Sequence, residues 1–419
     1  MKHTGLLLIF FLIFFPVFAQ NCQNDSVGFI PINDLGDGIF NGKKGGLYGN
    51  GKNEMPDEHL KAGIAYAKKI RPLNAKGEAD SAGKIGFISI GMSNANMFFA
   101  SFKDSALAFA DLNTKLVLAN CAIGSKDIDN LTDLRDSYWT EVPKRLSQAG
   151  ITAAQVQVVW FEQAQHITKI PRGEGIEHIA KIEEKFLFVF KHLKKIFPNL
   201  QQIFCSGRDY GNYGLQGRGN PEPYAYYTGW AFRNLVERQL NQDPLLRHDV
   251  SENGTVWLAW ADYIWANGNN PRKDGFKWIC PDDLESDGVH PSPTGRAKVA
   301  AMLMKFFAQD ATTIWFKNLQ KDDDNGDDDG NDDDNITSSE LLDEKPFVKI
   351  TPNPAKGIFS IDSEKIEIVN VQIFNSLGTQ ILESNKAQID LSHFPNGVYM
   401  LKISDRQGRI FSESVFLSR

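Results

Sequence analysis

The segment KIGFISIGMSN at residues 84–94 decides the fold of this chain. It opens with a short apolar run that is rich in β-branched residues, a pattern typical of a buried strand. The run ends at Gly91, and a helix-compatible stretch begins beside Ser93. A strand that leads directly into a helix predicts the first half of a βαβ unit, and with it a parallel sheet.

The same alternation continues along the chain. Further strand-like runs, separated by helix-compatible segments, occupy residues 115–119, 155–161, 201–206 and 255–261. The helical segment at 176–196 carries apolar residues at 3.6-residue spacing, as an amphipathic helix does. We therefore predict a three-layer α/β/α sandwich with a parallel sheet. In such sheets ligands bind at the carboxyl ends of the strands, so the chemistry is expected there.

The N-terminal part of the chain divides into two segments before this α/β domain, which we place at 81–318. Residues 1–19 combine Lys2 with an apolar run too short to span a bilayer comfortably, which predicts a secretory signal peptide. Residues 20–80 are rich in Gly and Asn and are expected to pack on the domain as ordered loop, with one short helix near 57–69.

The C-terminal part begins with an acidic segment. Residues 319–344 are expected to be an extended linker, because the nine Asp within 322–334 repel one another and have no apolar neighbours to bury. These closely spaced Asp and Asn could also bind calcium. Residues 345–419 contain short alternating strands broken by turns, which predicts a small antiparallel β-sandwich.

Composition sets limits on the function. The chain has 419 residues, of which 42% are hydrophobic and 23% charged, as in a soluble protein of two or three domains. It has no basic stripe with interleaved aromatic residues, which argues against nucleic-acid binding. The cysteines lack metal-ligand spacing and allow one or two disulfides whose pairing stays open. They are Cys22, Cys121, Cys205 and Cys280.

Two segments carry residue types that suit nucleophilic catalysis. Ser93 follows the first strand at a helix N-terminus, where free N–H groups favour negative charge, although it could simply cap the helix. Asp287 precedes His290 by three residues, so its carboxylate could hold the imidazole as a base for a serine hydroxyl. The alternative for this segment is a structural turn. The other histidines lack such a context, although His166 lies near a strand end.

These motifs together resemble a known superfamily. In chain order they are GMSN at 91–94, Gly124 after the second strand, Gln163 after the third strand and DGVHPSPTG at 287–295. Over roughly residues 84–308 the sequence resembles the SGNH/GDSL hydrolases, and GMSN with Gln163 looks like their carbohydrate acetylesterase branch. The resemblance implies a flavodoxin-like three-layer fold and ester hydrolysis without a metal or organic cofactor.

The resemblance also implies roles for single residues. Ser93 would be the nucleophile, His290 the general base and then acid, and Asp287 the carboxylate that orients the imidazole. The backbone N–H groups of Ser93 and Gly124 and the side chain of Gln163 would form the oxyanion hole. If Gln163 points away, Glu162 or Gln165 could face the cleft instead.

Three further residues are candidates for substrate binding. They are Asn94, Arg208 and Tyr224. Arg208 comes just after the fourth strand and could hold a carboxylate or a sugar hydroxyl, or else satisfy loop carbonyls. Tyr224 belongs to a group of tyrosines that precedes a cluster of tryptophans in the last third of the domain. Such aromatic residues can stack on sugar faces, but more often they belong to the core.

The C-terminal unit has a resemblance of its own. ITPNPAKG at 350–357, FNSLGTQI at 374–381 and LSHFPNGVYMLKI at 391–403 resemble the type A sorting domain of the type IX secretion system of Bacteroidetes. This implies that the type IX machinery carries the protein across the outer membrane, for release or surface attachment. The alternative is an accessory sugar-binding sandwich.

These expectations combine into one hypothesis. The chain is expected to be a secreted serine esterase that removes O-acetyl or similar acyl groups from a glycan through an acyl-enzyme. Its expected partners are the acylated glycan and the secretion machinery, with no stable membrane insertion. The alternative is a non-catalytic glycan-binding or surface protein on the same scaffold.

Overall fold

The computed structural model describes residues 21–215, 217–250, 254–318 and 347–417, apart from short gaps at 354, 365–366, 376–379 and 408. The chain forms two compact units, Met1–Asp322 and Asp323–Arg419, which are described separately below. The predicted signal peptide at 1–19 and the Asp-rich linker at 319–344, with the calcium binding considered for it, lie outside the described residues.

The first unit is built on a five-stranded parallel sheet with the strand order β4-β3-β5-β6-β7. Its strands are β3 (Ile85–Gly91), β4 (Leu116–Asn120), β5 (Val156–Glu162), β6 (Gln202–Cys205) and β7 (Trp257–Trp260). Every residue of β3, β5, β6 and β7 is buried, as expected for parallel strands with helices on both faces. The chain moves outward from β3 first to β4 and then to β5, so the topological switch point lies at β3.

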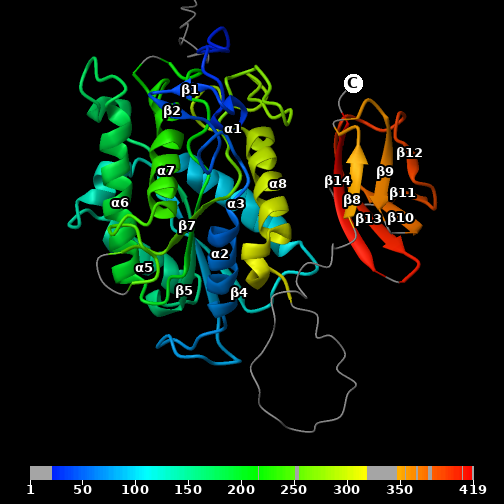
Figure 1. The fold of residues 1–419 in the computed structure, drawn as a ribbon, viewed down its shortest axis with the longest axis horizontal. Coiled ribbons are helices and arrows are strands. Elements are labelled where there is room, and N and C mark those ends of the chain that lie inside the picture. The colour runs from blue at the N-terminus through cyan, green and yellow to red at the C-terminus, as the bar shows by residue number, and fades with distance from the viewer. Residues whose placement is uncertain are drawn as a thin grey trace, which may run out of the picture. The chain divides into compact units, whose positions relative to one another are not determined.

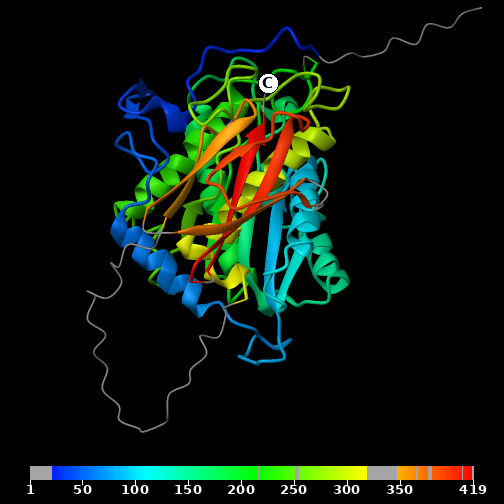
Figure 2. The same ribbon diagram turned by 90° about the vertical axis from the view of Figure 1, so that its right-hand side faces the viewer.

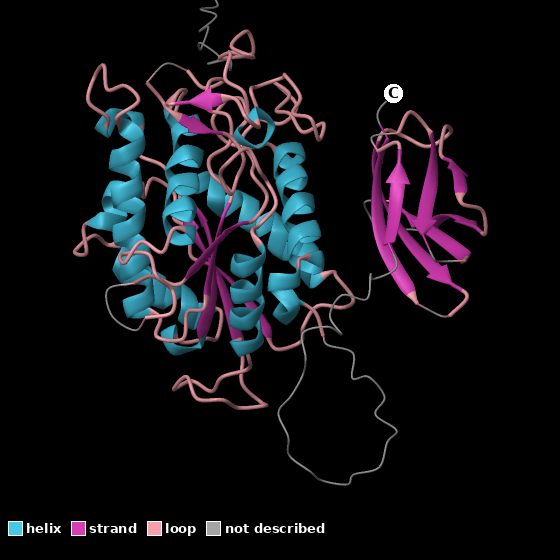
Figure 3. Cartoon of the chain, viewed as in Figure 1, coloured by secondary structure: helices cyan, strands magenta, loops and turns pink. Residues whose placement is uncertain are grey.

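Helices cover both faces of this sheet (Figures 1 and 3). On one face α3 (Ser93–Leu107) packs against α8 (Pro293–Gln309). The other face carries α4 (Ile128–Thr132), α5 (Tyr138–Gln148), α6 (His178–Ile196) and α7 (Tyr224–Leu240). Short 3₁₀ turns occur at η1 (Ala153–Gln155), η2 (Ile167–Lys169) and η3 (Ala311–Phe316). The predicted three-layer α/β/α class is therefore confirmed.

Residues 21–80 form an extension that wraps this unit. It contains α1 (Ile32–Leu35), the short hairpin β1 (Ile39–Phe40) with β2 (Lys43–Lys44), and α2 (Asp57–Lys69). Figures 1 and 2 show it in blue, running from the carboxyl ends of the strands towards their amino ends. Aromatic contacts attach it to α7, with Phe40 stacked on Trp230 at a centroid distance of 5.1 Å.

The tryptophans of the last third belong to the core. Trp257, Trp260, Trp265 and Trp278 are all at most 2% exposed. The indole N–H of Trp260 donates to the carbonyl of Leu47, in the extension, at 2.8 Å. These rings are buried inside the first unit, so their function is packing rather than sugar stacking.

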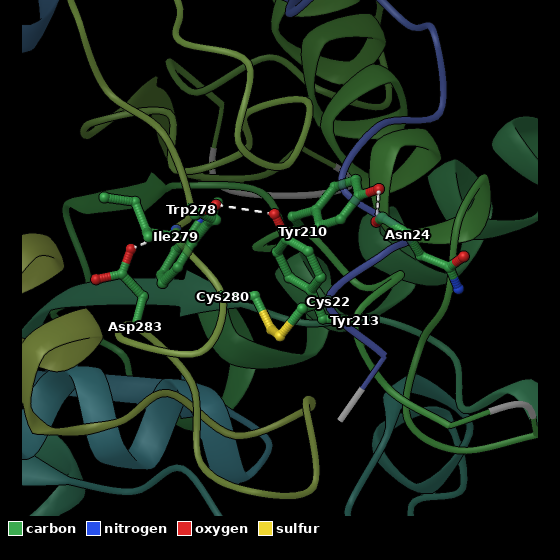
Figure 4. The surroundings of a disulfide bond; sticks show 8 residues. All are labelled: Cys22, Asn24, Tyr210, Tyr213, Trp278, Ile279, Cys280 and Asp283. Atoms are coloured by element: carbon green, nitrogen blue, oxygen red, sulfur yellow. Dashed lines mark hydrogen bonds between the residues drawn. A yellow bond between two sulfur atoms is a disulfide. The ribbon is translucent and has the colours of Figure 1, made fainter. Parts of the chain in front are cut away.

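A disulfide joins the start of the described chain to the segment before α8 (Figure 4). It links Cys22 to Cys280, which are 258 positions apart, while Cys121 and Cys205 are free and buried. Burial raises the pKa of the Cys121 thiol to about 12, so this group stays protonated and unreactive at neutral pH. The pairing that the sequence left open is thus Cys22 with Cys280.

Loss of this disulfide is expected to destabilise the first unit. A bridge that closes so long a loop restricts the unfolded chain, which predicts a loss of about 2–5 kcal/mol in unfolding free energy for the double variant Cys22→Ser/Cys280→Ser. Urea unfolding with and without reductant measures this effect. Reductant should destabilise the wild type and leave the double variant unaffected. An equal response of the two proteins would contradict the prediction.

The second unit is an antiparallel β-sandwich, as predicted. One sheet has the order β11-β10-β13-β14 and the other β12-β9-β8. The strands are β8 (Phe347–Thr351), β9 (Ile358–Glu364), β10 (Ile368–Phe374), β11 (Gln380–Ser384), β12 (Gln388–Asp390), β13 (Gly397–Asp405) and β14 (Ile410–Leu417). Inward-facing residues such as Val371, Ile373 and Leu401 form its own hydrophobic core. In neither unit does a described helix have the length and apolar character needed to cross a membrane.

Candidate active site

The candidate nucleophile lies where β3 turns into α3. A Cβ atom at Gly91 would lie 2.2 Å from the carbonyl oxygen of Glu162 and 2.4 Å from the Cβ of Ala95, so only glycine fits between strand and helix. Helix α3 begins at Ser93. The first N–H groups of a helix have no intrahelical partner and stand at the positive end of its dipole. Ser93 is therefore placed where negative charge is stabilised.

The structure brings Ser93, His290 and Asp287 together in the arrangement of a catalytic triad. The Oγ of Ser93 lies 2.9 Å from Nε2 of His290, and Nδ1 of His290 lies 2.5 Å from Oδ2 of Asp287. Because the carboxylate accepts the Nδ1 proton, Nε2 of the neutral ring is left to accept the serine proton. This geometry combines the start of α3 with a loop that comes almost two hundred residues later.

The hydrogen bonds around Asp287 keep it charged. Burial alone would raise its pKa, but the backbone N–H and ring of His290 and the N–H of Val289 outweigh this effect. The pKa of Asp287 therefore lies below its ordinary value. The carboxylate remains ionised at neutral pH and can stabilise an imidazolium on His290.

The loop that carries His290 is shaped by its glycines and by the cap of α8. Gly288 has a φ of 66°, in the left-handed region that favours glycine. Ser292 caps α8 by accepting the N–H of Gly295, and Pro293 follows as the first helical residue. A Cβ atom at Gly295 would lie 2.2 Å from the carbonyl oxygen of Asp283. The DGVHPSPTG motif thus encodes both the loop and the helix start behind it.

Gly124 lies beside the nucleophile. A Cβ atom placed on Gly124 would have the Cβ of Ser93 at 3.8 Å as its nearest contact, with no other atom within 4 Å. The loop is held there because the N–H of Ile123 donates to the carbonyl of Gly91 at 2.9 Å. The next residue, Ser125, lines the cleft with a φ of 64°, a conformation that non-glycine residues rarely adopt. Gly124 therefore leaves open space next to Ser93.

Gln163 does not take the place expected of it. Its Nε2 donates to the carbonyl of Lys126 and its Oε1 accepts the N–H of Ala164, both at 2.9 Å. The side chain is 1% exposed and is not part of the cleft wall. The two residues that could have faced the cleft in place of Gln163 also have other partners. Glu162 is buried against Arg208, and Gln165 donates to Asp129. The amide of Gln163 is thus bonded to the loop after β4 and does not point toward Ser93.

Asn94 holds the histidine loop in place instead of contacting substrate. It is fully buried, and its Nδ2 donates both to Oδ2 of Asp209 and to the carbonyl of Val289, each at 2.9 Å. Val289 directly precedes His290 in the chain. The role that we expected for Asn94 is therefore corrected, because its bonds fasten the start of α3 to the loop that carries His290.

Arg208 lies under the cleft within a buried group of charges. Its Nη1 donates to Oε1 of Glu162 at 2.8 Å, and its Nε lies 3.3 Å from Oδ1 of Asp209. All three residues are at most 4% exposed, yet Arg208 forms part of the cleft wall. Burial raises the pKa of Glu162 and of Asp209 above their ordinary values, although Arg208 opposes both shifts. The positive charge of Arg208 is thus opposed by the carboxyl groups of Glu162 and Asp209.

Tyr224 is not part of the cleft wall. Its hydroxyl donates to the carbonyl of Glu174 at 2.8 Å, and its ring packs edge-on against His178. The expected role in substrate binding is therefore corrected, because these contacts make the tyrosine part of the packing between α6 and α7.

The triad opens into a cleft with a volume of about 210 Å³. Its wall includes two residues that the sequence analysis did not select, His166 and Arg218. The two residues lie on loops that are far apart in the sequence. The only sequence signal for either was that His166 lies near the end of a strand. In the part of the chain that the structure describes, no group of three or more His, Cys, Asp or Glu is placed to hold a metal ion.

Comparison with known proteins identifies the second unit. Residues 349–416 match the family model described as a secretion system C-terminal sorting domain. This confirms the predicted type IX sorting domain, and it means that the chain is exported to the cell surface or secreted. The sorting domain also implies an interaction with the type IX machinery.

Two solved structures are distantly similar to this chain. No curated protein matches the sequence. The chain is similar to the solved structure of the salicylyl-acyltransferase SsfX3 from a tetracycline biosynthetic pathway, with 11% identity and a TM-score of 0.31 over 55% of this chain and 56% of that one. It is also similar to the apo structure of Bacteroides uniformis beta-glucuronidase 3, with 9% identity and a TM-score of 0.18 over 91% of this chain and 50% of that one. The chain thus spans about half the length of these two proteins, and similarities at this level say nothing about its activity.

Proposed function

We propose that the first unit is a serine esterase of the SGNH type that removes O-acetyl or similar short acyl groups from a glycan. The observation that carries this proposal is the triad geometry, in which Ser93 Oγ lies 2.9 Å from His290 Nε2 and His290 Nδ1 lies 2.5 Å from Asp287. A serine bonded to a histidine that a carboxylate orients is the arrangement that activates a hydroxyl for acyl transfer.

The reaction would proceed in two halves. Ser93 Oγ attacks the ester carbonyl while its proton moves to Nε2 of His290, and the carbonyl oxygen becomes an oxyanion. The backbone N–H groups of Ser93 and Gly124, with the dipole of α3, would stabilise this charge. The C–O bond to the sugar then breaks, and His290 gives its proton to the departing hydroxyl. In the second half His290 takes a proton from water, and the resulting hydroxide attacks the acyl carbonyl. The bond between the acyl carbon and Ser93 Oγ then breaks, and His290 returns its proton to the serine.

The cleft suits a short acyl group. Its volume of about 210 Å³ is small, and among the described residues of its wall only Met92 and Val289 have large apolar side chains. A long acyl chain would need an extended apolar surface to gain binding energy. Acetyl and similarly small acyl groups fit this wall better than the chains of lipid esters.

Export supports a substrate outside the cell. The sorting domain at 349–416 takes the protein to the cell surface or beyond it. Polysaccharides with acyl substituents are available to an exported hydrolase, which agrees with the resemblance of GMSN to carbohydrate acetylesterases.

The proposal is tested by covalent labelling and by acetate release. A fluorophosphonate that reacts with activated serines should add its mass to the peptide containing Ser93, and acetylated polysaccharides should release acetate. 4-Nitrophenyl acetate serves as a general ester probe. If the folded protein neither reacts with the fluorophosphonate nor hydrolyses any ester, a non-catalytic glycan-binding protein becomes the better description. The engagement of Gln163 by Lys126 and Ala164 is the observation that favours that alternative.

The Asp287→Asn variant is expected to lower kcat by about 10³–10⁴-fold. An asparagine can present its amide to Nδ1 of His290, which stabilises the tautomer with the proton on Nε2, and that ring cannot accept the serine proton. Steady-state hydrolysis of 4-nitrophenyl acetate measures the loss. Because the pKa of Asp287 lies below its ordinary value of 3.8, its own protonation should not limit wild-type activity above about pH 4. A variant that retains most of its activity would contradict the assigned role.

A further inference from the structure

We propose that Asp209 is a positioning residue for the reaction, because its carboxylate fixes the side-chain amide of Asn94, which in turn holds the loop of His290 beside Ser93. The inference rests on the proposed esterase function and deepens it, since it gives a residue outside the triad a part in the same reaction. Asp209 follows Arg208 in the loop after β6 and does not belong to the cleft wall.

The loop that carries His290 is shaped by hydrogen bonds within itself. Oδ1 of Asp287 accepts the N–H groups of Val289 and His290, and the N–H of Glu285 donates to the carbonyl of His290. These bonds set the conformation of the loop but not its distance from α3. That distance matters for the attack by Ser93, because a displacement of about 1 Å can cost about 100-fold in rate.

Two hydrogen bonds between described residues join this loop to the start of α3. One is the triad bond from Oγ of Ser93 to Nε2 of His290, and the other runs from Nδ2 of Asn94 to the carbonyl of Val289, both at 2.9 Å. The triad bond changes during turnover, since its proton moves to the imidazole. The bond from Asn94 carries no reacting proton, so it can keep the loop in place throughout the reaction.

Asp209 determines which way the amide of Asn94 faces. Nδ2 of Asn94 donates to Oδ2 of Asp209 at 2.9 Å, while Oδ1 of Asn94 is buried without a hydrogen-bond partner among the described residues. An ionised carboxylate and a backbone carbonyl only accept, so both require the NH₂ group. Without Asp209 a single contact would remain, and the amide could turn its oxygen toward the carbonyl of Val289.

The carboxylate of Asp209 is itself held in place. Nε of Arg208 lies 3.3 Å from its Oδ1, and the backbone N–H of Arg208 donates to Oγ1 of Thr228 in α7 at 3.1 Å. Asn94 and Asp209 are at most 2% exposed, so water competes little for these bonds. This series of contacts connects α7 and the loop after β6 to the carbonyl that precedes His290.

The experiment measures kcat and KM for 4-nitrophenyl acetate with the full chain. Asn94→Ala and Asp209→Ala are each expected to lower kcat by about 10–100-fold, because His290 is displaced from Ser93. KM should change by less than about 3-fold, since neither side chain belongs to the cleft wall. Labelling of Ser93 by the fluorophosphonate depends on the same base and should slow by a similar factor.

The double variant Asn94→Ala/Asp209→Ala tests whether Asp209 acts through Asn94. If it does, removal of Asp209 from a protein that already lacks Asn94 should lower kcat by no more than about 2-fold. The milder variant Asp209→Asn leaves one oxygen for two donors, Nε of Arg208 and Nδ2 of Asn94, so kcat should fall less than in Asp209→Ala. Combined with Asn94→Ala, it gives the same comparison where Asp209→Ala does not fold.

The control variant is Asp243→Ala, in the segment that follows α7. The carboxylate of Asp243 accepts from Nε of Arg238 and from the N–H of Leu245, so its loss also removes buried or half-buried bonds from the first unit. Urea denaturation establishes that each variant is folded under the assay conditions. Asp243→Ala should keep the wild-type kcat, whereas a general effect of lost stability would lower kcat in all variants.

The outcomes separate the two proposals. A folded Asp209→Ala protein with wild-type kcat would overturn the positioning role. Reductions that multiply in the double variant would also overturn it, because Asp209 would then act independently of Asn94. In both cases ester hydrolysis by the wild type leaves the proposed function intact. A wild-type protein that hydrolyses no ester and does not react with the fluorophosphonate would overturn the proposed function and this inference with it.

Discussion

The Ser93→Ala variant is expected to lose about 10⁴–10⁶-fold in kcat/KM on acetyl esters while keeping its fold. The hydroxyl is the atom that would form the acyl-enzyme, and no other nucleophile can replace it at the end of β3. Its removal takes away one hydrogen bond, to His290, at a partly exposed position. The expected change in unfolding free energy is therefore no more than about 1 kcal/mol.

The matched control for this variant is Ser105→Ala. Ser105 lies on the same helix, where its exposed hydroxyl donates to the carbonyl of Ser101. Activity is followed by acetate release and by hydrolysis of 4-nitrophenyl acetate, and folding by urea denaturation. Ser105→Ala should retain wild-type activity. Residual turnover within 10-fold of wild type in Ser93→Ala would rule out the acyl-enzyme mechanism.

The Arg208→Leu variant is expected to destabilise the first unit by about 3–5 kcal/mol at pH 7. Glu162 and Asp209 are both at most 2% exposed, and without Arg208 they become buried carboxylates with no opposing charge. The Oε2 atom of Glu162 already has no hydrogen-bond partner. The remaining side chains cannot compensate for the lost charge, so the folded state must protonate the carboxyl groups or lose free energy.

The pH dependence of this loss identifies its cause. In the folded variant the pKa of each carboxyl rises further above its ordinary value, which is 4.5 for Glu162 and 3.8 for Asp209. A raised carboxyl pKa means that stability falls as pH rises above the unfolded value. The penalty should thus be smaller at pH 5 than at pH 8, and Arg208→Leu/Glu162→Gln should recover part of it. The control is Arg71→Leu, because Arg71 is an exposed arginine of the same unit. A loss that does not depend on pH would point to packing alone.

The sequence by itself determined the parallel α/β framework and the triad. Buried parallel strands have continuous apolar sequences, which can be recognised along the chain. The βαβ units make the strands parallel, so their carboxyl ends lie at the same edge of the sheet. Asp287 and His290 lie within one short loop, so their spacing alone is enough to pair them. Ser93 is marked by its place between a strand and a helix. All of these signals are local, and the topology of the sheet brings them to one edge.

The tertiary structure decided the roles that depend on long-range partners. The residue types expected to face the substrate are present, but their side chains bond elsewhere. Gln163 bonds to Lys126, Asn94 bonds to Asp209 and Val289, and Tyr224 bonds to Glu174. No pattern in the sequence identifies those partners, because a side-chain amide or hydroxyl bonds to whichever backbone group the packed loops bring within 3 Å. The same reason hid the proximity of His166 and Arg218, whose loops meet through backbone hydrogen bonds that any residue type can form. The pairing of Cys22 with Cys280 was likewise set by the path of the N-terminal extension across the folded unit.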